Sequence, residues 1–512
     1  MVYYRERGGK RRDLPMDPLI TTVLVSLDLP SASDKRADKE RLLDGLVRSG
    51  VHTPVEMSPA LLAGLPAALR ACDFSPLLTL GWEGDRARVV AINKRIVYGL
   101  AIDAGTTNIV ASLFDMTACR RIAAREHENP QIAEGLDVLS RVHAAMSGRG
   151  EELHALLIDG INALIGELCS DHGIRSEDIC AAVIAGNTIM MHFLLDLPVH
   201  TIPVDPYLPV AHRMDFVRPR DAGIAINDQA VVYIFPNAGS YVGGDIIAGI
   251  LVSGLHANER PSLLIDVGTN AEIVLGCSEW IMVGAGAAGP ALESGIAEIG
   301  MRATEGAVAG VVLEKDTPAA VLKVIGGGAP RGICGSGVIE LVAELYDNGI
   351  IDGQGRLSAS SPNVVERDGG RAFVLYESAG ARLMIKDTDI DNFLRSKAAM
   401  FASLYVMVHA VGLTFGDVLT VYVSGAFGAG IDADKAVRIG MLPDIPRERF
   451  VALGNSSLKG AEAVLTDRGA LAAVDRICGL ITYREMNTDG AFMREFPAAL
   501  FIPHTNPDVL KS

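Results

Sequence analysis

Apolar positions along the chain fall into short runs that alternate with stretches of helical periodicity, which indicates an α/β protein. The run 20–27 is rich in β-branched residues, as strands are, and Ser58 followed by Pro59 marks the start of a helix. Residues 15–97 therefore predict a small α+β domain. Its expected elements are strands at 20–27, 77–80 and 87–92 and helices at 34–50 and 58–70.

From residue 98 onward, strand-like and helix-like stretches keep alternating and glycine-rich turns separate them. Such alternation predicts layered sheets with helices packed against them. The most apolar stretch, 179–197, contains Asn187, His192 and Asp196. It therefore predicts a buried strand followed by a helix that Asn187 caps, rather than a membrane span.

A polar turn between two apolar runs is the first candidate for chemistry. Residues 97–114 read VYGLAIDAGTTNIVASLF, and Asp103 closes the first run. Glycine lets backbone N–H groups approach a phosphate, threonine hydroxyls donate to its oxygens, and an aspartate holds hydrated magnesium or orients a water. The candidate phosphate-binding residues of this hairpin are Gly105, Thr106, Thr107 and Asn108.

The same pattern recurs in the second half of the chain, where residues 262–275 read SLLIDVGTNAEIVL and Asp266 closes the first run. One such turn is explained by local side-chain bonding alone. Two copies in the same strand–turn–strand context favour phosphate binding, with two facing hairpins that clamp a polyphosphate between two domains. The second set of candidates is Gly268, Thr269 and Asn270.

A third turn follows the strand-like run that begins at residue 421 and precedes a helix. A strand–glycine–helix turn can lay a nucleoside against the backbone, although such turns also occur for packing alone. The candidates that would border an adenosine are Ser424, Gly425, Ala426 and Gly428.

Charge and cysteine spacing restrict the classes of partner and cofactor that the chain can bind. The chain has 46 Lys and Arg against 62 Asp and Glu, a net charge of −16, which disfavours nucleic acid and anionic membranes as partners. The one dense basic segment lies in residues 1–14, which we expect to be a disordered tail. Seven scattered cysteines lack C-x2-C spacing. They favour free thiols in a reducing cytoplasm and exclude the usual zinc-ribbon and ferredoxin-type signatures.

Together these motifs resemble the superfamily of acetate and sugar kinases, heat-shock chaperone ATPases and actin. Within it, the chain is similar over nearly its whole length to the ATP-dependent reductive activators of corrinoid enzymes and corrinoid proteins. The matching stretches are NPQ (129–131), GLDVLSR (135–141), AGNT (185–188), MH (191–192), VGGDI (242–246), AGPALE (288–293), GMRA (300–303), GICGSG (332–337), SGAFG (424–428), GNSSLKGA (454–461), EMN (485–487) and FIPH (501–504).

The resemblance implies an α/β fold of the two-lobed actin-like ATPase type, built from ribonuclease H-like repeated subdomains. The lobes would cover about 98–260 and 261–512 of the ATPase region 98–512, behind a small domain similar to the family's middle domain. It also implies a cytoplasmic ATPase that uses ATP and Mg²⁺ to rescue a corrinoid methyl carrier, reducing inactive Co(II) to Co(I). The partner would be a corrinoid protein, and a homodimer is left open.

In that account Asp103 positions magnesium through water, and Asp266 contacts phosphate and metal and orients the attacking water. The hairpin residues named above hold the terminal phosphates. Closure of the two lobes on nucleotide is a hinge event that would change the cobalt ligation of a docked partner.

One departure from the family concerns electrons. Bacterial members usually begin with a ferredoxin-like domain that holds a two-iron cluster, and archaeal relatives carry clusters at the C-terminus. This sequence shows neither cysteine pattern. We therefore expect no iron–sulfur cluster in this chain and a separate ferredoxin or reductase as the electron donor.

Two other functions stay open: a small-molecule kinase with Asp266 as base, and a nucleotide-switched scaffold or chaperone. The sequence names neither the corrinoid protein and methyl donor nor the electron donor. Three residues have a structural and a functional interpretation. For Cys334 a small buried residue at a helix start is favoured over an activated thiol, and for His192 a core histidine is favoured over a cofactor contact. For Asp245 a helix cap and a metal-facing carboxylate are equally open.

Overall fold

The computed structural model describes residues 16–268, 271–286, 297–314, 320–367, 369–378, 381–425, 430–486 and 489–512. The expected basic tail, 1–14, lies outside these residues. The chain forms two compact units, of which the first comprises Met1–Val252 and Ser457–Gly479 and the second Ser253–Ser456 and Leu480–Ser512. A division into two continuous lobes does not anticipate the segment 457–479, which belongs to the first unit although it follows most of the second.

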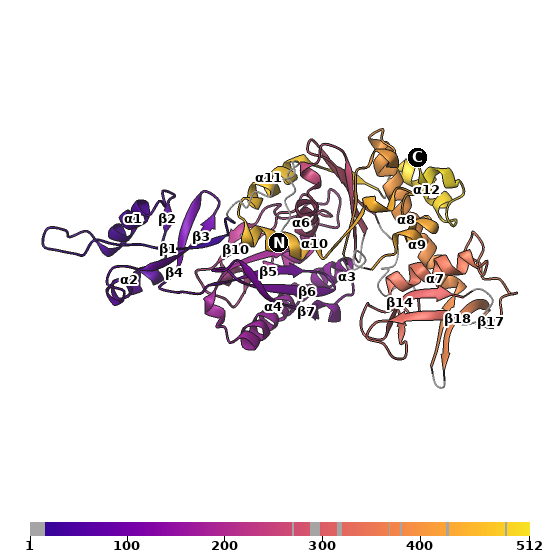
Figure 1. Ribbon diagram of the computed structural model, residues 1–512, viewed down its shortest axis with the longest axis horizontal. Coiled ribbons are helices and arrows are strands. Elements are labelled where there is room, and N and C mark those ends of the chain that lie inside the picture. Colours follow the sequence, from indigo (N-terminus) through magenta and orange to yellow (C-terminus); the bar gives the residue numbers. More distant parts are fainter. Residues whose placement is uncertain are drawn as a thin grey trace. The chain divides into compact units, whose positions relative to one another are not determined.

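The N-terminal part of the first unit is a four-stranded sheet in the order β1-β3-β4-β2 with two helices (Figure 1). Its elements are β1 (Ile20–Leu24), α1 (Asp38–Arg48), β2 (Val55–Glu56), α2 (Pro59–Ala71), β3 (Leu77–Glu83) and β4 (Arg86–Ile92). Ser58 caps α2, as predicted, because its side chain accepts the N–H of Leu61. The assigned strand ends at Leu24, but Val25 N and Leu27 N still donate to Pro76 O and Phe74 O, so the pairing extends to the predicted residue 27.

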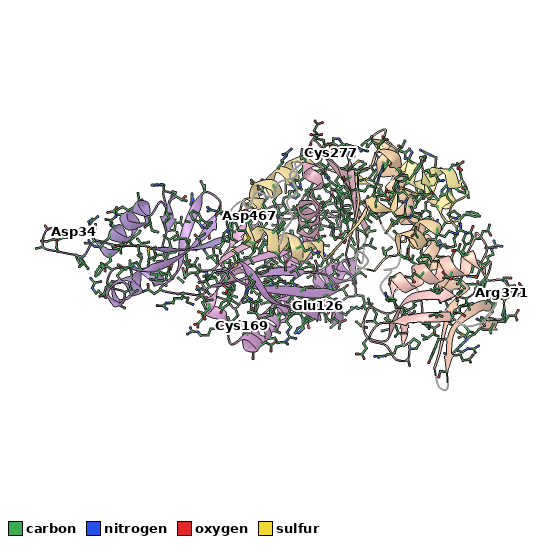
Figure 2. All side chains as sticks on the ribbon, viewed as in Figure 1. Asp34, Glu126, Cys169, Cys277, Arg371 and Asp467 are labelled. Carbon is green, nitrogen blue, oxygen red and sulfur yellow. The ribbon has the colours of Figure 1, made fainter. Side chains whose placement is uncertain are left out.

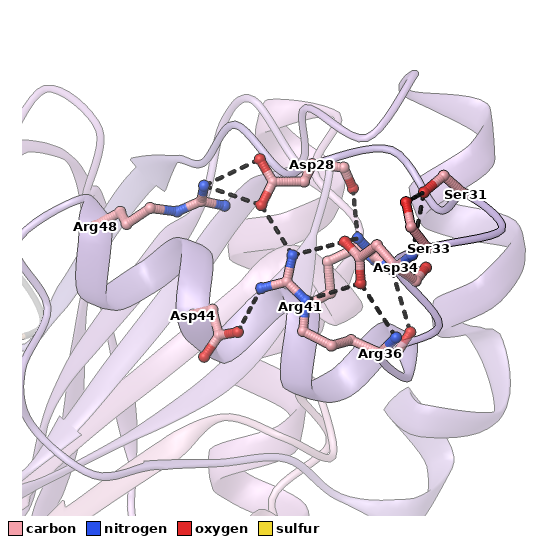
Figure 3. A network of polar contacts seen from close by, with 8 residues as sticks. All are labelled: Asp28, Ser31, Ser33, Asp34, Arg36, Arg41, Asp44 and Arg48. Atoms are coloured by element: carbon pink, nitrogen blue, oxygen red, sulfur yellow. Dashed lines mark hydrogen bonds and ion pairs between the residues drawn. The ribbon is translucent and has the colours of Figure 1, made fainter.

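The first helix begins at Asp38 rather than at 34 because a network of charges folds the preceding loop (Figure 3). Arg41 is completely buried and donates to Asp28 O at 2.9 Å and Asp34 Oδ2 at 2.6 Å. Arg36 adds bonds to Asp28, Asp34 and Asp44. Hydrogen bonds from Arg36 and Arg41 hold the pKa of Asp34 well below its usual range. The loop is therefore fixed by charge rather than by helical bonds.

The rest of the first unit is built on a six-stranded sheet in the order β7-β6-β5-β8-β10-β9. Its strands are β5 (Tyr98–Ala104), β6 (Asn108–Asp115), β7 (Arg120–Glu128), β8 (Ile179–Ala185), β9 (Asp215–Val217) and β10 (Val231–Ile234). Its helices are α3 (Val138–Ala144), α4 (Gly150–His172), α5 (Thr188–Leu194), α6 (Gly244–Ser253), α10 (Ser456–Thr466) and α11 (Ala470–Leu480). Strand β8 and helix α5 confirm the prediction that residues 179–197 form a buried strand and a helix.

Helix α4 supplies much of the core on this sheet, where Leu157, Ile161 and Leu164 pack with the strands' apolar residues. Among the described residues one helical stretch, Val138–His172, meets the length and composition of a membrane span. The buried side of α4 within that stretch belongs to the core of the sheet, as in a core helix of a globular protein.

The second unit repeats the plan with a six-stranded sheet in the order β21-β20-β11-β12-β13-β22. Its strands are β11 (Ser262–Val267), β12 (Ala271–Gly276), β13 (Ile281–Gly286), β20 (Val421–Ser424), β21 (Phe450–Gly454) and β22 (Ile481–Glu485). One three-stranded sheet has the order β15 (Ala320–Val324), β14 (Ala307–Leu313), β16 (Gly332–Ile333). Another has the order β17 (Val364–Arg367), β18 (Gly370–Ser378), β19 (Ala381–Lys386). The helices are α7 (Gly335–Asp347), α8 (Asp387–Ala410), α9 (Ala433–Arg438) and α12 (Gly490–Ala499).

The two large sheets share one strand order. Strands β7-β6-β5-β8-β10 correspond to β13-β12-β11-β20-β21, with the antiparallel hairpin first and parallel neighbours after it. The two aspartates occupy the same place in this pattern, since each is the penultimate residue of its hairpin's first strand. The repeat read from the two D-x-G-T motifs is therefore confirmed by the topology.

A buried lysine fastens the C-terminal segment of the second unit. Lys397 of α8 is completely buried, and its Nζ donates to Ala499 O at 2.6 Å and to Phe501 O and Pro503 O at 2.7 Å. Burial lowers the pKa of Lys397 to about 7, and the carbonyl oxygens oppose this shift because they accept the three N–H bonds of the ammonium form. One side chain thus satisfies three backbone groups.

Replacing Lys397 by Met leaves these three carbonyls without their donor. We expect Lys397→Met to destabilise the protein by about 3 kcal/mol, since buried acceptors without partners are costly. Urea unfolding followed by circular dichroism measures this loss. The control is Lys511→Met, at a side chain that is 70% exposed. Equal stability of the two variants would contradict the role given to Lys397.

Candidate functional site

The first candidate site is the β5–β6 hairpin. Asp103 lies near the end of β5, and Gly105–Thr107 form the turn before β6, as the sequence predicts. Ser457, at the start of α10, donates its Oγ to Asp103 Oδ1 at 2.7 Å. A side chain at Gly105 would place its Cβ 2.5 Å from Asn108 O, so only glycine permits this tight turn.

Two residues from other segments, Asn129 and Arg141, hold the tip of this hairpin. Asn129 Nδ2 donates to Gly105 O at 2.9 Å, and Asn129 N donates to Thr107 O at 2.8 Å. Arg141 Nη2 donates to Thr106 O at 2.6 Å. Sequence reasoning assigned no role to Asn129, Arg141 or Ser457, although all three fall in the stretches that carry the family resemblance.

Asn187 joins the hairpin to helix α5. Its side chain accepts the N–H of Met190 at 2.9 Å, so it caps the helix as expected, and its Nδ2 donates to Thr106 Oγ1 at 2.9 Å. One side chain therefore fixes both the helix start and the Thr106 hydroxyl.

The side chain of Asn108 turns toward the neighbouring strand. Its Nδ2 donates to Oε1 of Glu126, which lies on β7 (Figure 2). Its amide is thus engaged along the sheet, and the part of this hairpin most suited to phosphate is the Gly105–Thr107 turn. Asp245 lies in the first turn of α6, where its N–H donates to Gly186 O at 3.2 Å and its Oδ1 accepts the N–H of Ile246 at 2.8 Å.

The second candidate site lies at the carboxyl ends of β11 and β20. Asp266 pairs with Ser424 across the parallel ladder, and Gly268 follows β11. Gly425 has φ +82°, and a Cβ there would lie 2.4 Å from Val267 O and 2.8 Å from Asp266 Oδ1. Only glycine therefore allows the backbone at this position to lie so close to the end of β11 and to the aspartate. The remaining candidates of this site lie outside the described residues: Thr269, Asn270, Ala426 and Gly428.

Two serine hydroxyls in this region are buried without a hydrogen-bond partner among the described atoms. Ser424 is the last residue of β20, Ser456 comes shortly after the end of the neighbouring strand β21, and both serines are at most 1% exposed. A buried hydroxyl without a partner costs free energy, which a polar ligand would recover. These serines are candidates for such a contact.

The described part of the chain contains no group of three or more His, Cys, Asp or Glu side chains arranged to hold a metal. Magnesium keeps several waters and is commonly bound through one or two carboxylates together with substrate phosphates. Single carboxylates beside glycine-rich turns, as at Asp103 and Asp266, fit that mode. The residues present therefore suit a magnesium–nucleotide better than a resident metal centre.

Three family descriptions match consecutive parts of the chain: the RACo linker region at residues 9–96, the RACo middle region at 98–258, and the C-terminal ASKHA domain of RACo at 260–512. The small N-terminal domain therefore corresponds to the linker region, and the expectation that it resembles the family's middle domain is wrong. A solved structure titled reductive activator for corrinoid, iron–sulfur protein is 36% identical with a TM-score of 0.89, covering 97% of this chain and 81% of that one. The chain belongs to the RACo family.

Two curated proteins are similar to this RACo-family chain. The corrinoid activation enzyme RamQ of Eubacterium limosum is 30% identical over 79% of this chain and 70% of its own length. The [Co(II) methylated amine-specific corrinoid protein] reductase of Methanosarcina barkeri is 24% identical over 75% of this chain and 73% of its own. The fold is the actin-like ATPase fold, named for the RACo family as the ASKHA domain.

Two residues of the RACo-family chain, His192 and Cys334, are buried and hydrogen-bonded within the protein core. His192 is completely buried, with Nδ1 bonded to Thr188 O and Nε2 accepting the N–H of Val210, and burial lowers its pKa. It is the core histidine that the sequence favoured. Cys334 is the buried N-cap residue of α7 and donates its Sγ to Val308 O at 3.4 Å, which fits the small-residue interpretation. All seven cysteines are described, and they are free thiols.

Gly425 allows a test of the second site. In Gly425→Ala the new Cβ would clash with Val267 O and Asp266 Oδ1, and we expect ATP affinity to fall by about tenfold or more. Isothermal titration calorimetry with Mg-ATP measures this. Gly412→Ala is the matched control, because Gly412 has a similar φ of +73° but open space where a Cβ would lie. Equal ATP affinity of the two variants would show that the close approach at Gly425 does not matter.

Proposed function

We propose that this chain is an ATP-dependent activator of a corrinoid protein, which couples ATP binding and hydrolysis to reduction of Co(II) corrinoid to Co(I). The relatives support the substrate, since one is named a corrinoid activation enzyme and the other a Co(II) corrinoid protein reductase. The single observation that carries the ATP dependence is the repeated hairpin. Asp103 and Asp266 are the penultimate residues of the equivalent strands β5 and β11, and each is followed two positions later by a glycine.

The proposed reaction balances as two linked half-processes. One electron from a separate donor, a ferredoxin or a reductase, reduces Co(II) to Co(I), and ATP and water give ADP and phosphate. The donor is proposed to be separate because the sequence lacks the cysteine spacing of a ferredoxin-type cluster. Hydrolysis drives the conformational change that makes this uphill electron transfer possible.

The residues then take the following proposed roles. Asp103, oriented by Ser457, would hold magnesium through water, and the turn Gly105–Thr107 would donate to phosphate oxygens. Asp266 would position the attacking water. Ser424 would donate its unpaired hydroxyl to the nucleotide beside Gly425. When bound, magnesium would supply the positive charge that neutralises the phosphates.

The test measures phosphate release with and without a Co(II) corrinoid protein, using the corrinoid protein of a methylated-amine methyltransferase system as the probe. We expect ATPase stimulation by the Co(II) form, and appearance of the Co(I) absorption spectrum once a reduced ferredoxin is added. Absence of stimulation by the Co(II) protein would overturn the proposed function.

Conservative variants of the two aspartates should separate binding from hydrolysis. We expect Asp266→Asn to keep ATP binding but to lower the stimulated rate by about a hundredfold or more, as loss of a water-positioning group does. Asp103→Asn should in addition weaken the magnesium dependence of binding. Asp228→Asn, at an exposed aspartate, is the control. A wild-type rate in Asp266→Asn would refute its assignment.

A further inference from the structure

Arg141 lies on the short helix α3 and contacts the tip of the first hairpin, where its Nη2 donates to Thr106 O. Its side chain is completely buried. The helix begins after Asp137, whose carboxylate accepts the N–H of Ser140. This cap fixes the first turn of the helix, to which Arg141 belongs. Nothing in the proposed reaction yet uses this buried cation.

The guanidinium donates to three oxygen atoms. Besides the 2.6 Å bond to Thr106 O, Nε donates to Gly135 O at 2.9 Å and Nη1 to Gln131 Oε1 at 3.0 Å. Gln131 is oriented in turn, because its Nε2 donates to Leu153 O at 2.7 Å. Arg141 therefore ties the hairpin tip to the segment 131–135 by a rigid planar group that a lysine cannot reproduce.

These bonds also set the direction of the hairpin's N–H groups. Asn129 holds Gly105 O, and Arg141 holds Thr106 O. In a trans peptide the C=O and N–H point in opposite directions, so the N–H groups of Thr106 and Thr107 face away from these two side chains. Successive N–H groups presented on one side form a concavity that attracts anions.

The charge of Arg141 has no ion-pair partner in the part of the chain that the structure describes. Burial lowers its pKa to about 10, and Asp137 opposes this shift only from a distance. A buried charge without a counter-ion is costly. The guanidinium polarises the Thr106–Thr107 peptide, and this polarisation makes the Thr107 N–H a stronger donor. A phosphate that accepts this N–H on the opposite side of the peptide would offset the cost of the buried charge.

We propose that Arg141 is a positioning residue of the phosphate site, which fixes the Gly105–Thr107 turn and supplies its positive charge through the Thr106 carbonyl. The inference rests on the proposed ATP-dependent function. Because the phosphates and Arg141 stabilise each other, loss of Arg141 lowers affinity for the phosphate part of the nucleotide and not for the nucleoside.

The experiment compares binding of Mg-ATP and of adenosine to the full chain by isothermal titration calorimetry. We expect Arg141→Gln to weaken Mg-ATP binding by about ten- to a hundredfold and to leave adenosine binding unchanged. Arg141→Lys should recover part of the loss, because it keeps the charge without the planar fork. Arg149→Gln, at an exposed arginine paired with Glu134, is the control and should bind both ligands normally.

A purely structural role would lower melting temperature and affect both ligands equally, so an unchanged ratio of ATP to adenosine affinity overturns the proposal. If Arg141→Gln does not fold, Arg141→Lys carries the test, and the same ratio decides it. Failure of the unmodified chain to bind Mg-ATP would overturn this inference and the proposed function together. Normal ATP binding without stimulation by the Co(II) corrinoid protein would overturn only the proposed function.

Discussion

The candidate sites depend on the parallel pairing of each hairpin's first strand with a later strand, β5 with β8 and β11 with β20. Parallel strands end at the same edge of a sheet, so residues far apart in sequence are brought together without any long-range motif. Asp103 lies beside Ala185, and Asp266 lies beside Ser424. The chemistry at each edge follows from this pairing.

A second requirement follows from the first. A turn that leaves the edge of a sheet loses the ladder partners of its carbonyl groups, and these groups need other donors. In the first unit the donors are side chains, Asn129 for Gly105 O and Arg141 for Thr106 O. Asn187 secures the Thr106 hydroxyl in the same way. The hairpin thus has a conformation fixed by its own chain before any ligand binds.

The sequence predicted the parts that are encoded locally. Both hairpins, the cap at Ser58, the cap at Asn187 and the core histidine His192 follow from residue types within a few positions of one another. The contact of Ser457 with Asp103 could not be read in this way, because it joins positions 354 residues apart. Arg141 was equally hidden, since a lone arginine on a short helix suggests a solvated side chain. Only its place in a family-like stretch marked it.

The return of residues 457–479 to the first unit bears on how the protein is made. Ser457 lies at the start of α10, and Gly460 of that helix lies against Ala248 on α6. The two helices are so close that a Cβ at Gly460 would lie 2.4 Å from the Cβ of Ala248. During synthesis the first unit must wait for a segment that leaves the ribosome after nearly all of the second. A fragment cut after residue 252 would expose the face of α6 that α10 covers. Separate expression of the first unit would therefore need residues 457–479 to be grafted back by a linker.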